Sequence, residues 1–332
     1  MSARLKNILK YILFLGVAGL FLYLAFRKAE WSKLVSDFQS ADYSYVIYSM
    51  IMGYAAFISR GLRWNLLLEP LGKKAKPWNA VHAISIGYFA NIAVPRAGEV
   101  MRCTSLKSTD DIPLERLFGT VVLERVIDAA ILLALIVLTF ILQLSNLQTF
   151  FEQAFAQSGG SEGGIDLKWV LLGGILVFGL LAFLLRHRIQ ALPIFVKVRE
   201  LWQGFKEGFK SLSKVQNKWA FYGHTAFIWI MYFLMIYIVI FALPATSEIS
   251  LANALFVMIA GGMGMVVPAP GGIGSYHYLV MLALGVIGVS EADGLSFATL
   301  VHSGQMVMTL IAGVIALPMI YRARRILKKQ SA

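Results

Sequence analysis

The segments GYFANIAVPRAGEV (Gly87–Val100) and GGMGMVVPAPGGIGS (Gly261–Ser275) decide which fold this chain can form. When Pro95 is aligned with Pro268, both segments read Val-Pro-x-x-Gly. Each break follows about a dozen apolar or small residues, fewer than the roughly 20 that a membrane-spanning helix needs. Proline lacks a backbone N–H and glycine adopts unusual dihedral angles, so we expect a helix to break in each segment.

Such breaks have consequences inside a membrane. Broken backbone leaves polar groups that lipid cannot satisfy, so a break is tolerated only beside protein or a water-filled cavity. Paired broken helices in corresponding halves of a chain indicate a transporter-like site, and two unrelated helix kinks are the alternative. The residues that we assign to the two re-entrant breaks are Pro95, Gly98, Pro268, Pro270, Gly271, Gly272 and Gly274.

The composition indicates an integral membrane protein. The chain has 332 residues, of which 58% are hydrophobic and 14% are charged, whereas a soluble domain has about 45–50% apolar and about 25% charged residues. We therefore predict an all-α fold: a polytopic membrane bundle of about six spanning helices, with two re-entrant broken-helix hairpins at 80–107 and 251–289. The segments predicted to span the membrane are 8–26, 43–59, 118–142, 168–186, 219–243 and 295–321.

The charged residues between these segments predict the topology. The net charge is +12, and basic residues concentrate in 60–79, in 186–218 and in the tail after Tyr321, whereas the charges of 143–167 are all acidic. Basic loops stay in the cytoplasm, so the first hairpin should enter the membrane from the cytoplasm and the second from outside, as in an inverted-topology repeat. Both termini are then cytoplasmic, in a bacterial-type inner membrane. Because the charge follows the topology, we expect no nucleic acid partner.

A single membrane domain, 1–332, follows from this organisation. Its halves are 1–142 and 168–321, and no polar stretch is long enough for a soluble catalytic domain. Residues 191–213 alternate apolar and basic side chains at helical spacing, which predicts an amphipathic helix lying on the cytoplasmic leaflet. A solvated linker helix packed on the bundle is the alternative.

Charged residues inside the predicted membrane segments are candidates for function, because each costs at least about 2.5–3.5 kcal/mol at a helix centre. Glu99 and Arg102 share a helix face after the first break, and Glu124 and Asp128 share a face of the following span. These charges either neutralise one another as an internal network, or leave an arginine to bind a phosphate through paired hydrogen bonds. The candidate substrate-binding residues are Arg96, Glu99, Arg102, Glu124, Arg125, Asp128, His302 and Gln305.

Signatures of enzymes and metal sites are missing from the sequence. HExxH, GxSxG and P-loop motifs do not occur, the five histidines are scattered, and Cys103 is the single cysteine. We therefore assign no catalytic residue, no metal ligand and no cofactor. A lone histidine on an apolar helix, such as His302, is more often a packing residue than a ligand.

Three blocks of sequence, taken together, resemble the flippase-like transmembrane family, also called the lysylphosphatidylglycerol synthase transmembrane region. The blocks are PRAGEVMR (Pro95–Arg102), TVVLERVIDAAILLAL (Thr120–Leu135) and PAPGGIGSYHYLVMLALG (Pro268–Gly285). The resemblance implies a bundle with two re-entrant hairpins that handles lipids. The soluble aminoacyl-transfer domain of the full synthases has no counterpart here, so lysyl transfer is not implied. Many relatives carry a Tyr-Arg pair in the last helix, where this chain reads Val301-His302-Ser303-Gly304-Gln305.

We therefore predict a lipid translocase, or a lipid-binding transporter, that moves a polar-headgroup lipid across the inner membrane. The partner would be an anionic or aminoacylated phospholipid or a polyprenyl-phosphate-type lipid. One alternative is a membrane-embedded transferase acting on a lipid phosphate, and another is a partner subunit that binds lipid without transporting it. The sequence leaves the oligomeric state open, a homo-oligomer included.

Overall fold

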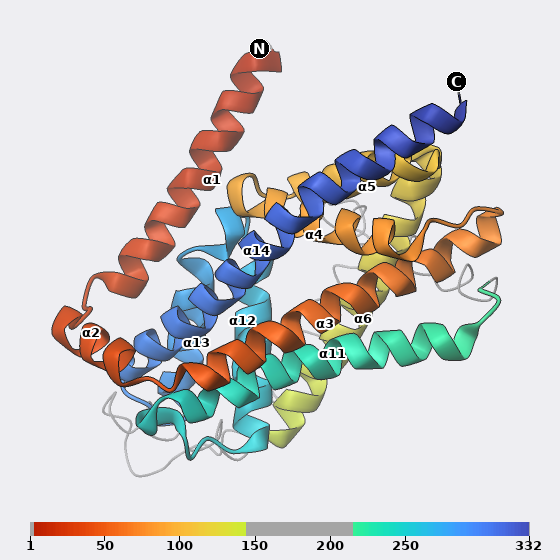
Figure 1. The fold of residues 1–332 in the computed structure, drawn as a ribbon. Coiled ribbons are helices and arrows are strands. Elements are labelled where there is room, and N and C mark those ends of the chain that lie inside the picture. The colour runs from red at the N-terminus through yellow and green to blue at the C-terminus, as the bar shows by residue number, and fades with distance from the viewer. Residues whose placement is uncertain (1–2, 144–214, 332) are drawn as a thin grey trace, which may run out of the picture. The chain divides into compact units, whose positions relative to one another are not determined.

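The computed structural model describes residues 3–143 and 215–331, and every regular element within these ranges is a helix (Figure 1). This agrees with the predicted all-α fold. The first range contains α1 (Ala3–Phe26), α2 (Trp31–Ser40), α3 (Tyr43–Leu68), the short 3-10 turn η1 (Glu69–Leu71), α4 (Pro77–Ala93), α5 (Ala97–Asp110) and α6 (Leu114–Leu142). The second contains α11 (Lys218–Val239), the 3-10 turns η2 (Ile240–Ala242) and η3 (Pro244–Thr246), α12 (Leu251–Val266), the turn η4 (Pro270–Gly272), α13 (Ser275–Val286) and α14 (Glu291–Ser331).

Two compact units divide the chain: residues 1–124 with 213–332, and residues 125–212. Helix α6 starts in the first unit and ends in the second. Within the first unit α3 runs along α11, α14 lies along α4, and α12 packs against α13 (Figure 1). The main core forms where α3, α4, α5, α14 and the start of α6 meet, and its buried apolar residues are Phe57, Trp64, Leu68, Ala75, Ala80, Ala83, Ile84, Cys103, Leu106, Ile112, Leu117, Val121, Met308 and Ala312.

Three described helices are long and apolar enough to cross a membrane. They are α6, α11 together with η2, and α14, and they match the predicted spans 118–142, 219–243 and 295–321. Helices α1 and α2, which contain the predicted span 8–26, pass the same test as a pair bent by 86°. The described chain therefore supports three or four crossings, and the predicted number of six is not confirmed.

The remaining predicted membrane elements have different outcomes. The span 43–59 is helical as part of α3, but its tyrosines and serines leave α3 without an 18-residue stretch as apolar as those of the three long helices. The predicted span 168–186 and the amphipathic helix 191–213 lie outside the described residues. They stay predictions.

Helix α3 corrects one expectation about topology. The sequence placed residues 60–79 in a basic loop, but the helix continues to Leu68, so Arg60 and Arg63 are buried helical residues and not loop charges. The η1 turn over Glu69–Leu71 ends the helix, with Gly72 in a left-handed conformation (φ 67°) after it. The loop that follows keeps only three lysines, which weakens the charge argument for its side of the membrane.

Polar contacts join other elements near each end of α3. At one end the N–H of Asp42 donates to Ala242 O (3.0 Å), and Lys33 Nζ lies 2.7 Å from Asp293 Oδ1. At the other end Arg116 Nη1 donates to Leu71 O (2.7 Å). A helix of 26 residues is about 39 Å long at 1.5 Å per residue. The contacts at the two ends are therefore far enough apart to lie on opposite sides of a membrane.

The first break separates α4 from α5, which pack against each other as a hairpin. Arg96 lies between them in a left-handed conformation with φ 65°, which is uncommon for a residue with a side chain. The N–H of Gly98, in the first turn of α5, donates to Asn91 Oδ1 at 2.8 Å. A Cβ at Gly98 would overlap the carbonyl oxygen of Gly87. The close packing of the two helices therefore requires glycine at position 98.

The second break separates α12 from α13 and uses the glycines of η4. Ser275 Oγ, at the start of α13, donates to the carbonyl oxygens of Gly264 (2.8 Å) and Gly272 (3.2 Å), which fixes the turn. Gly274 has φ 83°, and a Cβ there would lie 2.6 Å from the backbone nitrogen of Leu22 in α1. Helix α1 therefore packs directly on the backbone of this hairpin.

The two hairpins meet at their tips. Helix α4 contacts η4, and a Cβ placed on Gly271 would lie 3.5 Å from the Cα of Ile92. The structure has a break between two packed helices in each of these segments. Their re-entrant position in the membrane and the inverted repeat stay predictions.

Candidate functional site

Three arginines surround one glutamate in the interior of the first unit. Glu124, at the end of the first third of α6, is completely buried. Its Oε1 lies 3.1 Å from Arg60 Nη1 and 3.4 Å from Arg63 Nη2, and its Oε2 lies 3.1 Å from Arg102 Nη1. The three guanidinium groups are also buried. These four residues form the arginine–glutamate cluster.

Helices α3, α5 and α6 supply the cluster. Arg60 and Arg63 are three residues apart on α3 and therefore face the same side of that helix. Trp64 follows them, and its ring lies 4.9 Å from the centre of the Arg102 guanidinium. The indole N–H of Trp64 donates to Thr120 Oγ1 on α6 at 2.8 Å. Aromatic packing and a hydrogen bond thus hold Arg102 in place next to Glu124.

The charges of the cluster do not balance. Three guanidinium groups carry three positive charges, and Glu124 carries one negative charge. Glu99 lies one helical turn before Arg102 on α5 and adds a second carboxylate to that helix. Arg102 also keeps two buried nitrogen atoms, Nε and Nη2, that have no hydrogen-bond partner among the described residues. Buried donors of a charged group are costly when unpaired, so this part of Arg102 is suited to an anionic acceptor.

The predicted site residues of the first half do not all lie together. Arg102 and Glu124 are in the cluster, and Glu99 is half-buried on the same helix as Arg102. Arg96 is exposed at the hairpin tip. Arg125 and Asp128 belong to the second unit, so their part in the site stays a prediction.

Arg60 and Arg63 were missed as site residues, because the sequence placed them in a cytoplasmic loop. A signal for them exists in the sequence. No helix stop follows the segment 43–59 until Glu69-Pro70. A helix predicted to continue to that stop would have included both arginines. Two arginines at i,i+3 would then have fallen inside a membrane segment, where charges mark function.

A second polar group lies around His302 of α14, on the side of the second hairpin. The His302 ring stacks on Tyr276 at 4.9 Å between centroids, and the ring of His277 lies 4.8 Å away. His277 Nδ1 accepts a hydrogen bond from Gly274 N (3.3 Å). Both ring nitrogens of His302 are buried, with no hydrogen-bond partner among the described residues. The structure therefore brings His302 to the second break, and Gln305 lies one turn further along α14.

The long apolar helices, and the charges buried between helices α3, α5 and α6, define a polytopic helical membrane protein. The chain belongs to the family described as the lysylphosphatidylglycerol synthase TM region, whose model matches residues 8–313. The family resemblance drawn from the three sequence blocks is thereby confirmed, and the protein is an integral membrane protein.

Two curated proteins are similar to this chain. "Glycosyltransferase AglD" of Haloferax volcanii is 25% identical over 313 residues, which is 85% of this chain and 50% of that protein. "UPF0104 membrane protein MJ1595" of Methanocaldococcus jannaschii is 29% identical over 131 residues, which is 39% of this chain and 38% of that protein. The chain thus spans half or less of the relatives that it matches. No solved structure matches it significantly.

Proposed function

We propose that this chain binds the phosphate-bearing headgroup of a membrane lipid at the arginine–glutamate cluster and moves that lipid between the leaflets. The observation that carries the proposal is Arg102, a buried arginine with two nitrogen atoms that have no hydrogen-bond partner among the described residues. Guanidinium recognises phosphate through two parallel hydrogen bonds. Membership of a membrane family named for a lipid synthase supports a lipid as the source of that phosphate.

Burial of the three arginines fits a transporter, which opens its binding site only during part of its cycle. The arginines are nearly inaccessible in this conformation, so a headgroup reaches Arg102 only when α5 moves relative to α3 or α6. The hairpin α4–α5 is the element that carries Arg102, and its tip lies against the second hairpin. Movement of one hairpin against the other would therefore open the cluster, as in alternating access around a fixed site.

A membrane-embedded transferase is the second candidate. The similarity to a protein named as a glycosyltransferase favours it, and a lipid phosphate could be a substrate at the same arginines. The chain corresponds to half of that relative, so the similarity alone does not assign a transfer reaction to it. A lipid-binding partner subunit without transport is a third outcome of the test below.

Reconstitution of the full chain in liposomes tests the proposal. Fluorescent lipids with different phosphate headgroups are incorporated, and a membrane-impermeant reductant bleaches the outer leaflet. We expect the wild-type protein to expose the inner-leaflet lipid and Arg102→Gln to stop most of this movement. Arg102→Lys should restore it only in part, because an ammonium group does not reproduce the paired hydrogen bonds of guanidinium.

Arg324→Gln is the matched control, since Arg324 is exposed near the end of α14, and it should move lipid like the wild type. Thermal melts of each variant in detergent separate loss of transport from loss of folding. Lipid movement that is unchanged in a folded Arg102→Gln protein would reject the site. A new lipid product detected by mass spectrometry, without transbilayer movement, would favour the transferase.

A further inference from the structure

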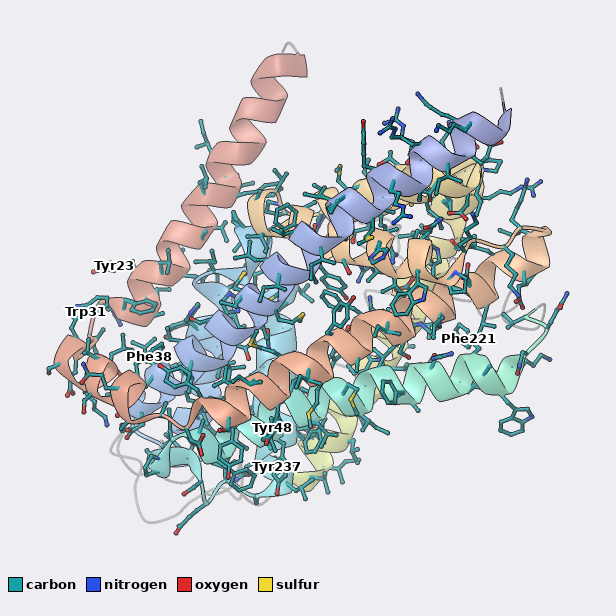
Figure 2. The ribbon with its side chains drawn as sticks, in the orientation of Figure 1. Tyr23, Trp31, Phe38, Tyr48, Phe221 and Tyr237 are labelled. Atoms are coloured by element: carbon teal, nitrogen blue, oxygen red, sulfur yellow. The ribbon has the colours of Figure 1, made fainter. Side chains whose placement is uncertain are left out.

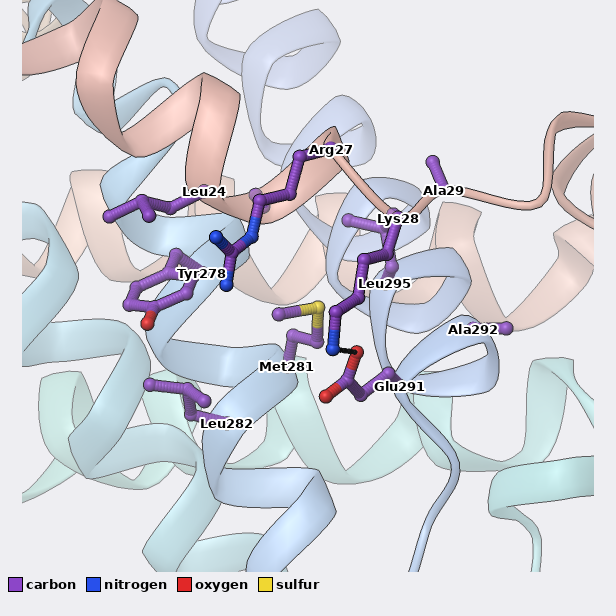
Figure 3. A pocket seen from close by; sticks show the side chains of 11 residues that line it. Leu24, Arg27, Lys28, Ala29, Tyr278, Met281, Leu282, Glu291, Ala292 and Leu295 are labelled. Atoms are coloured by element: carbon purple, nitrogen blue, oxygen red, sulfur yellow. Dashed lines mark ion pairs between the residues drawn. The ribbon is translucent and has the colours of Figure 1, made fainter.

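A small polar pocket opens where α1 ends and the chain bends into α2. It has a volume of about 70 Å³ and is lined by the bend, by α13 and by the start of α14. Figure 3 shows the Arg27 side chain beside Tyr278 and the Lys28 side chain reaching toward Glu291, with Met281 between them. A water molecule takes about 30 Å³ in the liquid, so the pocket has room for more than one small polar group.

Side chains near the bend place it at the level of lipid headgroups. Tyr23 and Trp31 lie on either side of the bend (Figure 2), and both are more than 60% exposed. Exposed aromatic residues of this kind concentrate at membrane–water interfaces. Helix α2 turns by 86° from α1 and keeps Val35 exposed as well, as expected for a helix lying along the interface.

The charges in the pocket suit a headgroup that carries both a phosphate and an amine. Arg27 is exposed, and among the described residues its guanidinium makes no ion pair or hydrogen bond. Lys28 and Glu291 form an ion pair at 3.6 Å, with side chains 67% and 61% exposed. Such a long, solvated pair contributes little, so Glu291 can exchange Lys28 for another ammonium group at low cost.

We propose that this pocket binds the headgroup of a phospholipid that carries a primary amine, such as phosphatidylethanolamine. Arg27 and Lys28 hold the phosphate, and Glu291 holds the amine. The acyl chains lie along α1, whose outer face exposes Leu20 and Tyr23. The site is separate from the arginine–glutamate cluster, because none of the residues lining it belongs to that cluster.

Titration of the full chain in detergent with defined lipids tests the pocket. The ligands are phosphatidylethanolamine, phosphatidylglycerol, diacylglycerol and inorganic phosphate, and native mass spectrometry reports the bound fraction. We expect phosphatidylethanolamine to bind better than diacylglycerol, and Arg27→Gln to weaken its binding about tenfold. Glu291→Gln should weaken binding of phosphatidylethanolamine more than that of phosphatidylglycerol, because only the first lipid has an amine.

Two controls keep the result specific. Arg324→Gln removes an exposed arginine far along the sequence and should leave binding unchanged. Lys218→Gln, at the exposed start of α11, should also keep the difference between phosphatidylethanolamine and diacylglycerol. Neither control nor Arg27→Gln changes the buried cluster, so the pocket can hold even if the proposed transport fails. Equal binding by wild type and Arg27→Gln would overturn the pocket. Competition by millimolar inorganic phosphate that displaces the lipid completely would show a site for free phosphate instead.

Discussion

Arg102 Nη1 lies 3.1 Å from Glu124 Oε2, and this pair joins the first hairpin to α6 across 22 positions of sequence. Arg60 and Arg63 bring α3 to the same carboxylate. The buried carboxylate of Glu124 therefore joins helices α3, α5 and α6. It attracts three arginines that repel one another. Such an arrangement depends on Glu124 more than on any single arginine.

Glu124→Gln should destabilise the protein strongly. Removal of one partner of a buried ion pair costs about 3–5 kcal/mol, and here it leaves three arginines without this carboxylate. Thermal melts in detergent measure the effect. Glu248→Gln, at an exposed position, is the control and should stay within about 0.5 kcal/mol of the wild type.

The same cluster gives a test of a purely structural role. If the charges only hold the helices together, replacing Arg60, Arg63 and Arg102 by Met and Glu124 by Leu should give a stable protein, since apolar residues of similar size often replace buried ion pairs without loss. Lipid movement should be lost in this variant if the arginines bind phosphate. A stable quadruple variant that moves lipid at the wild-type rate would rule out the binding role.

Gly98→Ala should disturb the first hairpin. The new methyl group would overlap Gly87 O and the side chain of Asn91, and overpacking of this kind costs about 1–3 kcal/mol. Gly119→Ala on α6 is the matched control, because a Cβ there meets nothing within 4 Å and alanine is the better helix former. Melting temperatures should fall for the first variant and stay level or rise for the second. Equal effects would mean that α4 and α5 do not pack this closely.

His302→Phe separates packing from ligand binding at the second hairpin. Phenylalanine keeps the ring that stacks on Tyr276 and removes two buried nitrogens without partners. Because unsatisfied buried polar atoms are costly, stability should be unchanged or higher by about 1 kcal/mol. A folded variant with reduced lipid movement would show that His302 contacts the headgroup. Full movement would assign His302 to packing.

Cysteine labelling tests the topology. The ion pairs Lys28–Glu291 and Lys33–Asp293 place the α1–α2 bend beside the start of α14. Cysteines at Ser32 and Ser290, in a Cys103→Ala background, should therefore react with an impermeant reagent from the same side. The charge bias of the loops predicts that this side is the outside, and that a cysteine at Ser108 is protected there. Labelling of Ser32 and Ser290 from opposite sides would contradict the ion pairs, and external labelling of Ser108 would contradict the cytoplasmic first hairpin.

The sequence by itself determined the class of protein and the two breaks. Hydrophobicity and the loss of a backbone donor at proline are local properties, so the long apolar helices and the breaks at Pro95 and Pro268 follow from neighbouring residues. Arg102 and Glu124 appeared among the predicted site residues because both are charges inside predicted membrane segments. Arg60 was not among them, because the helix was predicted to end at residue 59 and basic residues after an apolar segment were assigned to a loop.

Only the tertiary structure decided which charges meet. Arg60 and Arg63 contact Glu124 because α3 continues past residue 59 and packs beside α6, and a sequence window does not contain that long-range contact. The meeting of Ile92 with Gly271, and of His302 with Tyr276, likewise depends on helices that are distant in the chain. Burial makes the contacts of Arg60 and Arg63 with Glu124 strong, because a charge removed from water must be neutralised by the groups that folding brings to it.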